Sequence, residues 1–166
     1  MSGLVSELIK VITQEADYYD QLIKISTDKK IFIINNDINA LKDITCTENT
    51  LAGKMQRLEK KRLSLIVDIA NVLNEKEDNI TLSYLADIIT DPPQVEEMKD
   101  LTVRLKKSIT ALKELNEQNK VLIENALEYI DFSMNVIRST LDSSPTIFNS
   151  KGEELTTSMN LFDVRN

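Results

Sequence analysis

Any catalytic or metal-binding chemistry in this chain of 166 residues must rely on carboxylates, lysines and one thiol, because histidine is absent. Without histidine there can be no phosphohistidine relay, no Ser–His or Cys–His catalytic pair and no Glu-x-x-His di-iron motif. The glycine patterns of a P-loop and of a dinucleotide-binding turn are also missing. No spacing of Asp and Glu demands a carboxylate-only active site. The sequence therefore predicts a protein that is not an enzyme, with no cofactor and no metal ion.

The thiol and the one basic cluster both favour structural roles. Cys46 lies between two threonines on an expected helix, which favours a small packing residue over a nucleophile, and a single cysteine cannot form an internal disulfide. The basic cluster is spaced among Glu and Gln, as is typical of a solvated helix face. It consists of Lys54, Arg57, Lys60, Lys61 and Arg62.

The net charge and the apolar segments restrict the partners and the location of the chain. A formal net charge of −7 opposes binding to nucleic acid and to anionic membranes, which both need clustered cations. No apolar run is long enough to insert into a membrane, and the N-terminal stretch MSGLVSELIKVITQEADYYD lacks the basic region of a secretory signal. The lone cysteine is typical of a reducing compartment. We expect a cytoplasmic protein.

Few turns are expected, because the chain contains only three glycines and three prolines. This scarcity favours long helices, and apolar residues at spacings of three and four predict helices at about 2–35, 37–73, 81–90 and 93–141. Asp37 is the candidate N-cap of the second helix, and Asn79 or Thr81 that of the third.

The second predicted helix carries the strongest local pattern, a coiled-coil-like seam over four heptads. Eight of its ten seam positions are apolar, and the ten are Leu41, Ile44, Glu48, Leu51, Met55, Leu58, Arg62, Leu65, Ile69 and Val72. The short connection before Asp37 predicts an antiparallel hairpin with the first helix. The predicted fold is all-α: a long antiparallel helical hairpin, a short helix and a third long helix, forming an elongated bundle or coiled coil over residues 1–141.

The last helix is longer than the hairpin needs. At 1.5 Å per residue it would measure roughly 70 Å, against roughly 50 Å for each of the first two helices. We therefore expect its C-terminal third to extend past the hairpin or to pack with something else. Asn119 falls on its apolar stripe, where a single buried amide is more often a device that fixes helix register than a chemical group.

Residues 142–166 lose the helical periodicity and form an irregular, flexible tail in this prediction. A short apolar island, Ile147 and Phe148, precedes a turn signal that ends at Gly152. A second apolar cluster, which includes Leu161, Phe162 and Val164, follows a Ser/Thr tract. The residues alone leave two interpretations open: the tail closes reversibly on a bound partner, or it folds back as a static cover of the bundle.

Several segments, taken in order, resemble those of the FlgN-type flagellar export chaperones, nearly from end to end. They are NDINAL at 36–41, ITLSYLA at 80–86 and, as the most specific match, LNEQNKVLIENALEYI at 115–130. The tail is similar in form, with an aromatic–turn–Gly element at 148–152 and a Leu-Phe-Asp motif at 161–163. None of these segments is a catalytic signature.

The resemblance implies a cytoplasmic chaperone that binds the C-terminal amphipathic helices of the hook–filament junction (hook-associated) proteins. Such chaperones prevent premature assembly or degradation and then deliver the cargo to the membrane export gate. Carried over by position, the tail residues Ile147, Phe148, Gly152, Leu161, Phe162 and Val164 would close on cargo or dock at the gate. Many relatives have tyrosine where this chain has Phe148, so this chain has no phenolic hydroxyl at that position. The cargo-binding residues would be Leu122, Ile123, Ala126, Leu127, Ile130, Met134 and Ile137.

An adaptor coiled coil that associates with itself through the same apolar stripe is the alternative. The resting chain is expected to be a monomer or a homodimer. A stable oligomer that is indifferent to a junction-protein peptide would favour the adaptor, and a 1:1 complex would favour the chaperone.

Overall fold

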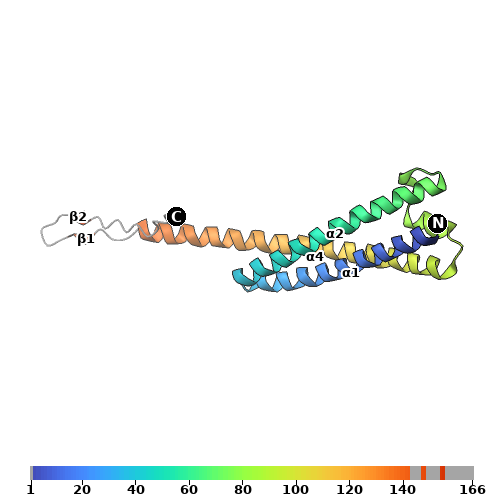
Figure 1. Ribbon diagram of the computed structural model, residues 1–166. Coiled ribbons are helices and arrows are strands. Elements are labelled where there is room, and N and C mark those ends of the chain that lie inside the picture. The colour runs from blue at the N-terminus through green and yellow to red at the C-terminus, as the bar shows by residue number, and fades with distance from the viewer. Residues whose placement is uncertain (1, 143–146, 149–153, 156–166) are drawn as a thin grey trace. The chain divides into compact units, whose positions relative to one another are not determined.

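The computed structural model describes residues 2–142, 147–148 and 154–155. Its helices are α1 (Ser2–Ile34), α2 (Ile38–Leu73), the 3₁₀ turn η1 (Glu77–Asn79), α3 (Leu82–Ile88) and α4 (Pro92–Asp142) (Figure 1). The predicted all-α fold is confirmed. In the region expected to be irregular, β1 (Ile147–Phe148) pairs antiparallel with β2 (Glu154–Leu155), with Ile147 opposite Leu155.

Backbone contacts divide the chain into two compact units, residues 1–125 and 126–166. The first unit contains α1, α2, α3 and the first part of α4, and the second contains the rest of α4 and the strand pair. The boundary that the sequence places after residue 141 stays a prediction.

Side-chain caps begin α2 and α3 where the sequence predicts them. The Asp37 carboxylate accepts a hydrogen bond from the Ala40 amide at 3.0 Å, so one of the free amides of the first turn of α2 is satisfied. Of the two candidates for α3, Thr81 is the cap, with its hydroxyl accepting from the Tyr84 amide at 3.1 Å. These caps fix where the connections end, and so which faces of the helices meet.

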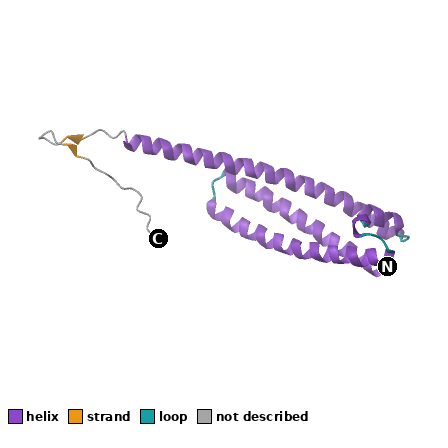
Figure 2. Ribbon diagram, turned by 90° about the horizontal axis from the view of Figure 1, so that it is seen from above, coloured by secondary structure: helices purple, strands orange, loops and turns teal. Residues whose placement is uncertain are grey.

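Ion pairs and hydrogen bonds show how the three long helices of the first unit are oriented. From α1 to α2, Glu7 pairs with Lys61 and Lys29 with Glu48, so these helices form the predicted antiparallel hairpin (Figure 2). From α1 to α4, Asp17 pairs with Arg104 and, further along both helices, Lys30 donates to Gln118. The residue numbers rise together, so α4 runs parallel to α1.

The apolar core of the first unit gathers where the start of α1, the second half of α2, α3 and the start of α4 meet. Ile12, Ile69 and Leu85 come from three of these helices and are fully buried. Met98 closes the core from α4. This end of the bundle supplies most of the hydrophobic stabilisation of the unit.

The α2 seam packs on α1 as the pattern predicts, with one exception. Its two polar positions are the ones that form ion pairs with α1: Glu48 with Lys29 at 2.7 Å, and Arg62 with Glu15 at 3.1 Å. Val72 is exposed instead of buried, because in the last turn of α2 it is Leu73 that packs against the core.

Two other sequence-based interpretations need correction. Cys46 is exposed and is not a packing residue, because it lies away from the seam positions on either side of it. The basic cluster is largely a solvated face, as expected, but Arg62 is half-buried in its ion pair with Glu15.

Candidate protein-binding surfaces

Apolar side chains lie exposed along α4 in the second unit. Of the predicted cargo-binding residues there, Leu127, Ile130 and Ile137 are exposed, with Leu127 at 57%, whereas Ala126 and Met134 are half-buried. In the first unit, Leu122 is half-buried and Ile123 is exposed. That all seven belong to one cargo-binding surface stays a prediction.

A second set of exposed apolar residues on the same stretch of α4 is absent from the predicted cargo-binding residues. It consists of Tyr129, Phe132 and Val136. Their spacing of three and four is itself a helical stripe, on a different side from Leu127 and Ile130, and that signal could have found them. More than one side of this stretch can therefore contact an apolar partner.

The predicted tail residues fall largely outside the described part of the chain. Ile147 and Phe148 form β1, of which only the backbone pairing is described. Gly152, Leu161, Phe162 and Val164 lie outside the described residues. Their role on cargo or at the export gate stays a prediction.

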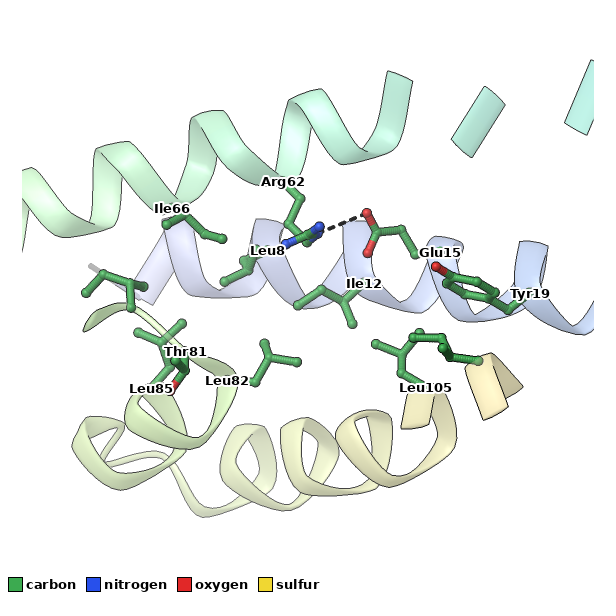
Figure 3. Close-up of a pocket in the computed structure, with 12 residues that line it drawn as sticks. Leu8, Ile12, Glu15, Tyr19, Arg62, Ile66, Thr81, Leu82, Leu85 and Leu105 are labelled. Atoms are coloured by element: carbon green, nitrogen blue, oxygen red, sulfur yellow. Dashed lines mark hydrogen bonds and ion pairs between the residues drawn. The ribbon is translucent and has the colours of Figure 1, made fainter. Parts of the chain in front are cut away.

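A hollow of about 260 Å³, here called the α3-side hollow, lies on α1 in the first unit. Figure 3 shows Leu8 and Ile12 of α1, Leu82 and Leu85 of α3 and Leu105 of α4 around this space. Its walls are apolar apart from the ion pair and the hydroxyls at its edge. This is the chemistry of a site for apolar side chains rather than for catalysis.

An ion pair lines this hollow, and its acidic partner, Glu15, is buried. Arg62 reaches from α2 to Glu15 on α1, as Figure 3 shows, and Glu15 is only 7% exposed. Burial raises the pKa of the Glu15 carboxyl above its ordinary value of 4.5, and the charge of Arg62 offsets this only in part. Burial likewise raises the pKa of Tyr19, which lines the same hollow.

Two further hollows continue along the same side of the unit, each of about 420 Å³. The central hollow shares Tyr19 and Ile109 with the α3-side hollow. The third, here called the Asn119 hollow, shares Asn116 and Lys120 with the central one. The three form one continuous depression over α1, bordered by α4 along its length and by α2 at both ends. We call it the α2–α4 groove.

The Asn119 hollow contains a polar contact between α1 and α4. The Asn119 amide donates from Nδ2 to the Ser26 carbonyl at 2.8 Å, and the Ser26 hydroxyl donates to Asn116 Oδ1 at 3.1 Å. Asn119 is only 4% exposed, and its buried Oδ1 has no hydrogen-bond partner among the described residues. The amide thus ties α4 to α1, as expected of a register-fixing residue, but leaves one acceptor unsatisfied.

Other classes of site gain no support from the described residues. Within residues 2–142 and the strand pair, no group of three or more Cys, Asp or Glu side chains could hold a metal ion. None of the helices described is long and apolar enough to cross a membrane.

Comparison with known proteins identifies the family. A family model described as FlgN protein matches residues 1–156. The chain belongs to the FlgN family. It is therefore a flagellar export chaperone, from a family of chaperones that bind flagellar proteins and not from a family of enzymes. Searches of curated proteins and of solved structures found no match. For a FlgN-family chaperone, the exposed apolar side chains of α4 and the α2–α4 groove are the candidate contacts with cargo.

Proposed function

We propose that this FlgN-family chain is a cytoplasmic chaperone for the C-terminal amphipathic helices of hook-associated junction proteins. It binds these helices after synthesis, prevents their premature assembly and delivers them to the membrane export gate. Family membership gives the general function, and the exposed apolar side chains of α4 support this particular form of it.

The observation that carries the proposal is the row Leu127, Ile130 and Ile137, which is exposed on a helix of an otherwise acidic chain. An apolar row of this kind, spaced by three and seven, is the complement of an amphipathic partner helix. Each such side chain that becomes fully buried contributes roughly 1.5–3 kcal/mol to binding. Three anchors are enough for a specific complex that can still dissociate at the export gate.

The tail is proposed to close over bound cargo through Phe148, Leu161, Phe162 and Val164. Because its apolar residues are few, closure would add a modest contribution and would remain reversible. Truncation after Leu141 is expected to leave the melting temperature nearly unchanged and to weaken cargo binding markedly. A truncated chain that binds cargo as tightly as the full chain would remove the tail from the proposal.

Hydrogen exchange tests the proposal as a whole. The full chain is measured alone and with a synthetic peptide of a junction-protein C-terminal helix. Added protection is expected across residues 122–166, and unchanged protection there would contradict the proposal.

Ile130→Asp is expected to weaken peptide binding at least about tenfold. The matched control Asn135→Asp adds the same charge at an exposed polar position five residues away and is expected to leave binding within about twofold.

A further inference from the structure

The three long helices of the first unit leave a depression between two of them. Both α2 and α4 pack on α1, and the depression between them runs through the α3-side, central and Asn119 hollows. A four-helix bundle would have a helix in this position. The depression is therefore the position at which the first unit lacks a fourth helix.

The length of the α2–α4 groove matches a helix. Its α4 border extends from Leu105 to Glu124, which corresponds to roughly 28 Å at 1.5 Å per residue. An occupying helix of about five turns would contact all three hollows. A short loop or a small molecule would fill only one of them.

The lining of the groove selects an amphipathic helix. Along α4, Leu105, Ile109, Leu112 and Ile123 line it, and Ile109 is 46% exposed although it belongs to the apolar stripe of α4. The ion pairs at its two ends, Glu15–Arg62 and Lys29–Glu48, are already satisfied within the chain. An apolar partner face is therefore favoured over a charged one.

Asn119 supplies a second, independent observation. Because its Nδ2 donates to the Ser26 carbonyl, its Oδ1 faces away from that carbonyl, and it has no partner among the described residues. A buried acceptor of this kind needs a donor. A side-chain amide or hydroxyl on the apolar face of an incoming helix would provide one once the side chains that cover Oδ1 move aside, and it would fix the register of that helix.

The groove is also continuous in sequence pattern with the proposed cargo row. The spacing of three and four that joins Leu105, Ile109, Leu112 and Asn116 continues through Ile123 to Leu127 and Ile130. Both sets of positions thus suit the same kind of apolar partner face.

We infer that the α2–α4 groove of the first unit is a docking site for an amphipathic helix of the cargo protein. A polar contact with Asn119 sets the register of the bound helix. The inference rests on the proposed function, since it takes the cargo helix as the occupant. A second copy of this chain and the chain's own tail are the competing occupants.

Photo-crosslinking in the full chain tests which occupant is present. A benzophenone side chain replaces Ile109 in one variant and Val103 in another; Val103 lies on the same helix, is 67% exposed and is absent from the lining of all three hollows. With a labelled junction-protein helix peptide, crosslinking is expected at 109 and not at 103. A product of twice the chain mass at 109 without peptide, or capture of the chain's own tail there, would overturn the inference in favour of the competing occupants.

Titration of the same peptide separates this inference from the proposed function. Ile109→Asp is expected to weaken binding at least about tenfold and Val103→Asp less than about twofold. Asn119→Leu, which removes the acceptor and the bond to the Ser26 carbonyl but keeps a side chain of similar size, is expected to weaken binding about tenfold while the chain stays folded. If wild type and all three variants bind equally well, the groove is not the site although the proposed function stands. If wild type does not bind the peptide, the proposed function itself fails.

Discussion

The two ends of the first unit differ in what their buried side chains do. At the α3 end, Leu8, Ile69 and Met98 form an apolar core with almost no exposure. At the end near the α1–α2 turn, the contact between α1 and α4 includes the polar residues Ser26, Asn116 and Asn119, with one acceptor unsatisfied. The same three helices thus stabilise the bundle through an apolar core at one end and leave a buried hydrogen-bond acceptor without a partner at the other. In proteins, such local costs in stability commonly mark the part that binds a partner.

The largest expected effect tests the α3 end. Ile69 is 0% exposed, so Ile69→Ala leaves a cavity and should lower the free energy of unfolding by about 2–5 kcal/mol. Chemical denaturation measures this. Val72→Ala, three residues along α2 at an exposed position, serves as the control and should stay within about 0.5 kcal/mol. Equal small effects for the two variants would show that the core does not lie where the comparison places it.

The next effect tests the polar end, where the substitution is expected to raise the free energy of unfolding instead of lowering it. Asn119→Leu removes a buried acceptor without a partner together with the hydrogen bond from Nδ2 to the Ser26 carbonyl, and that carbonyl keeps its helical hydrogen bond. We expect the free energy of unfolding to rise by about 1 kcal/mol, while peptide binding weakens. The exposed Asn125→Leu makes the same substitution six residues along α4, is the control and should change stability little. A marked loss of stability for Asn119→Leu would make the amide a purely structural residue.

A smaller effect concerns the ion pairs that link α1 to α4 between the two ends. Arg104 donates to Asp17 at 2.8 Å and also to Asp20, and its side chain is partly exposed. Arg104→Met should therefore cost less than about 1 kcal/mol, and the loss should shrink in high salt. Lys107→Met, which removes the same charge three residues along α4, is the control for net charge. An equal loss in both variants would mean that net charge alone is responsible.

The smallest effect is a difference in pH dependence at Glu15. Because its folded-state pKa is raised above 4.5, mainly by burial, the ionised carboxyl destabilises the folded chain at neutral pH. That cost is relieved as the pH falls through the folded-state pKa towards 4.5. Relative to Glu15→Gln, the wild type should therefore gain stability between pH 7 and about 4.5 in denaturant titrations. A relative loss over this range would mean that the ion pair with Arg62 outweighs burial.

The asymmetry between the two ends was only partly predictable from the sequence. Helical periodicity and the caps at Asp37 and Thr81 gave the helices, because these signals are local. The pairing of Glu48 with Lys29 and of Arg62 with Glu15 depends on the relative register of two helices, which the spacing within either helix does not contain.

The same reason explains why the groove was missed. Ile109 and Leu112 follow the helical spacing of three and four, which places them on the apolar stripe of the last helix. Whether a stripe residue is covered depends on how many helices surround it, and three helices leave part of the stripe open. Asn119 was expected to fix register, and its bond to Ser26 agrees with that role, but the unsatisfied Oδ1 could be recognised only in three dimensions.

The most direct test of the central claim is the mass of the chain in solution, by light scattering, alone and with a junction-protein C-terminal helix peptide. A chaperone whose exposed apolar surfaces accept one cargo helix predicts a 1:1 complex of chain and peptide. A stable oligomer whose mass is indifferent to the peptide would contradict this account and favour an adaptor that associates with itself.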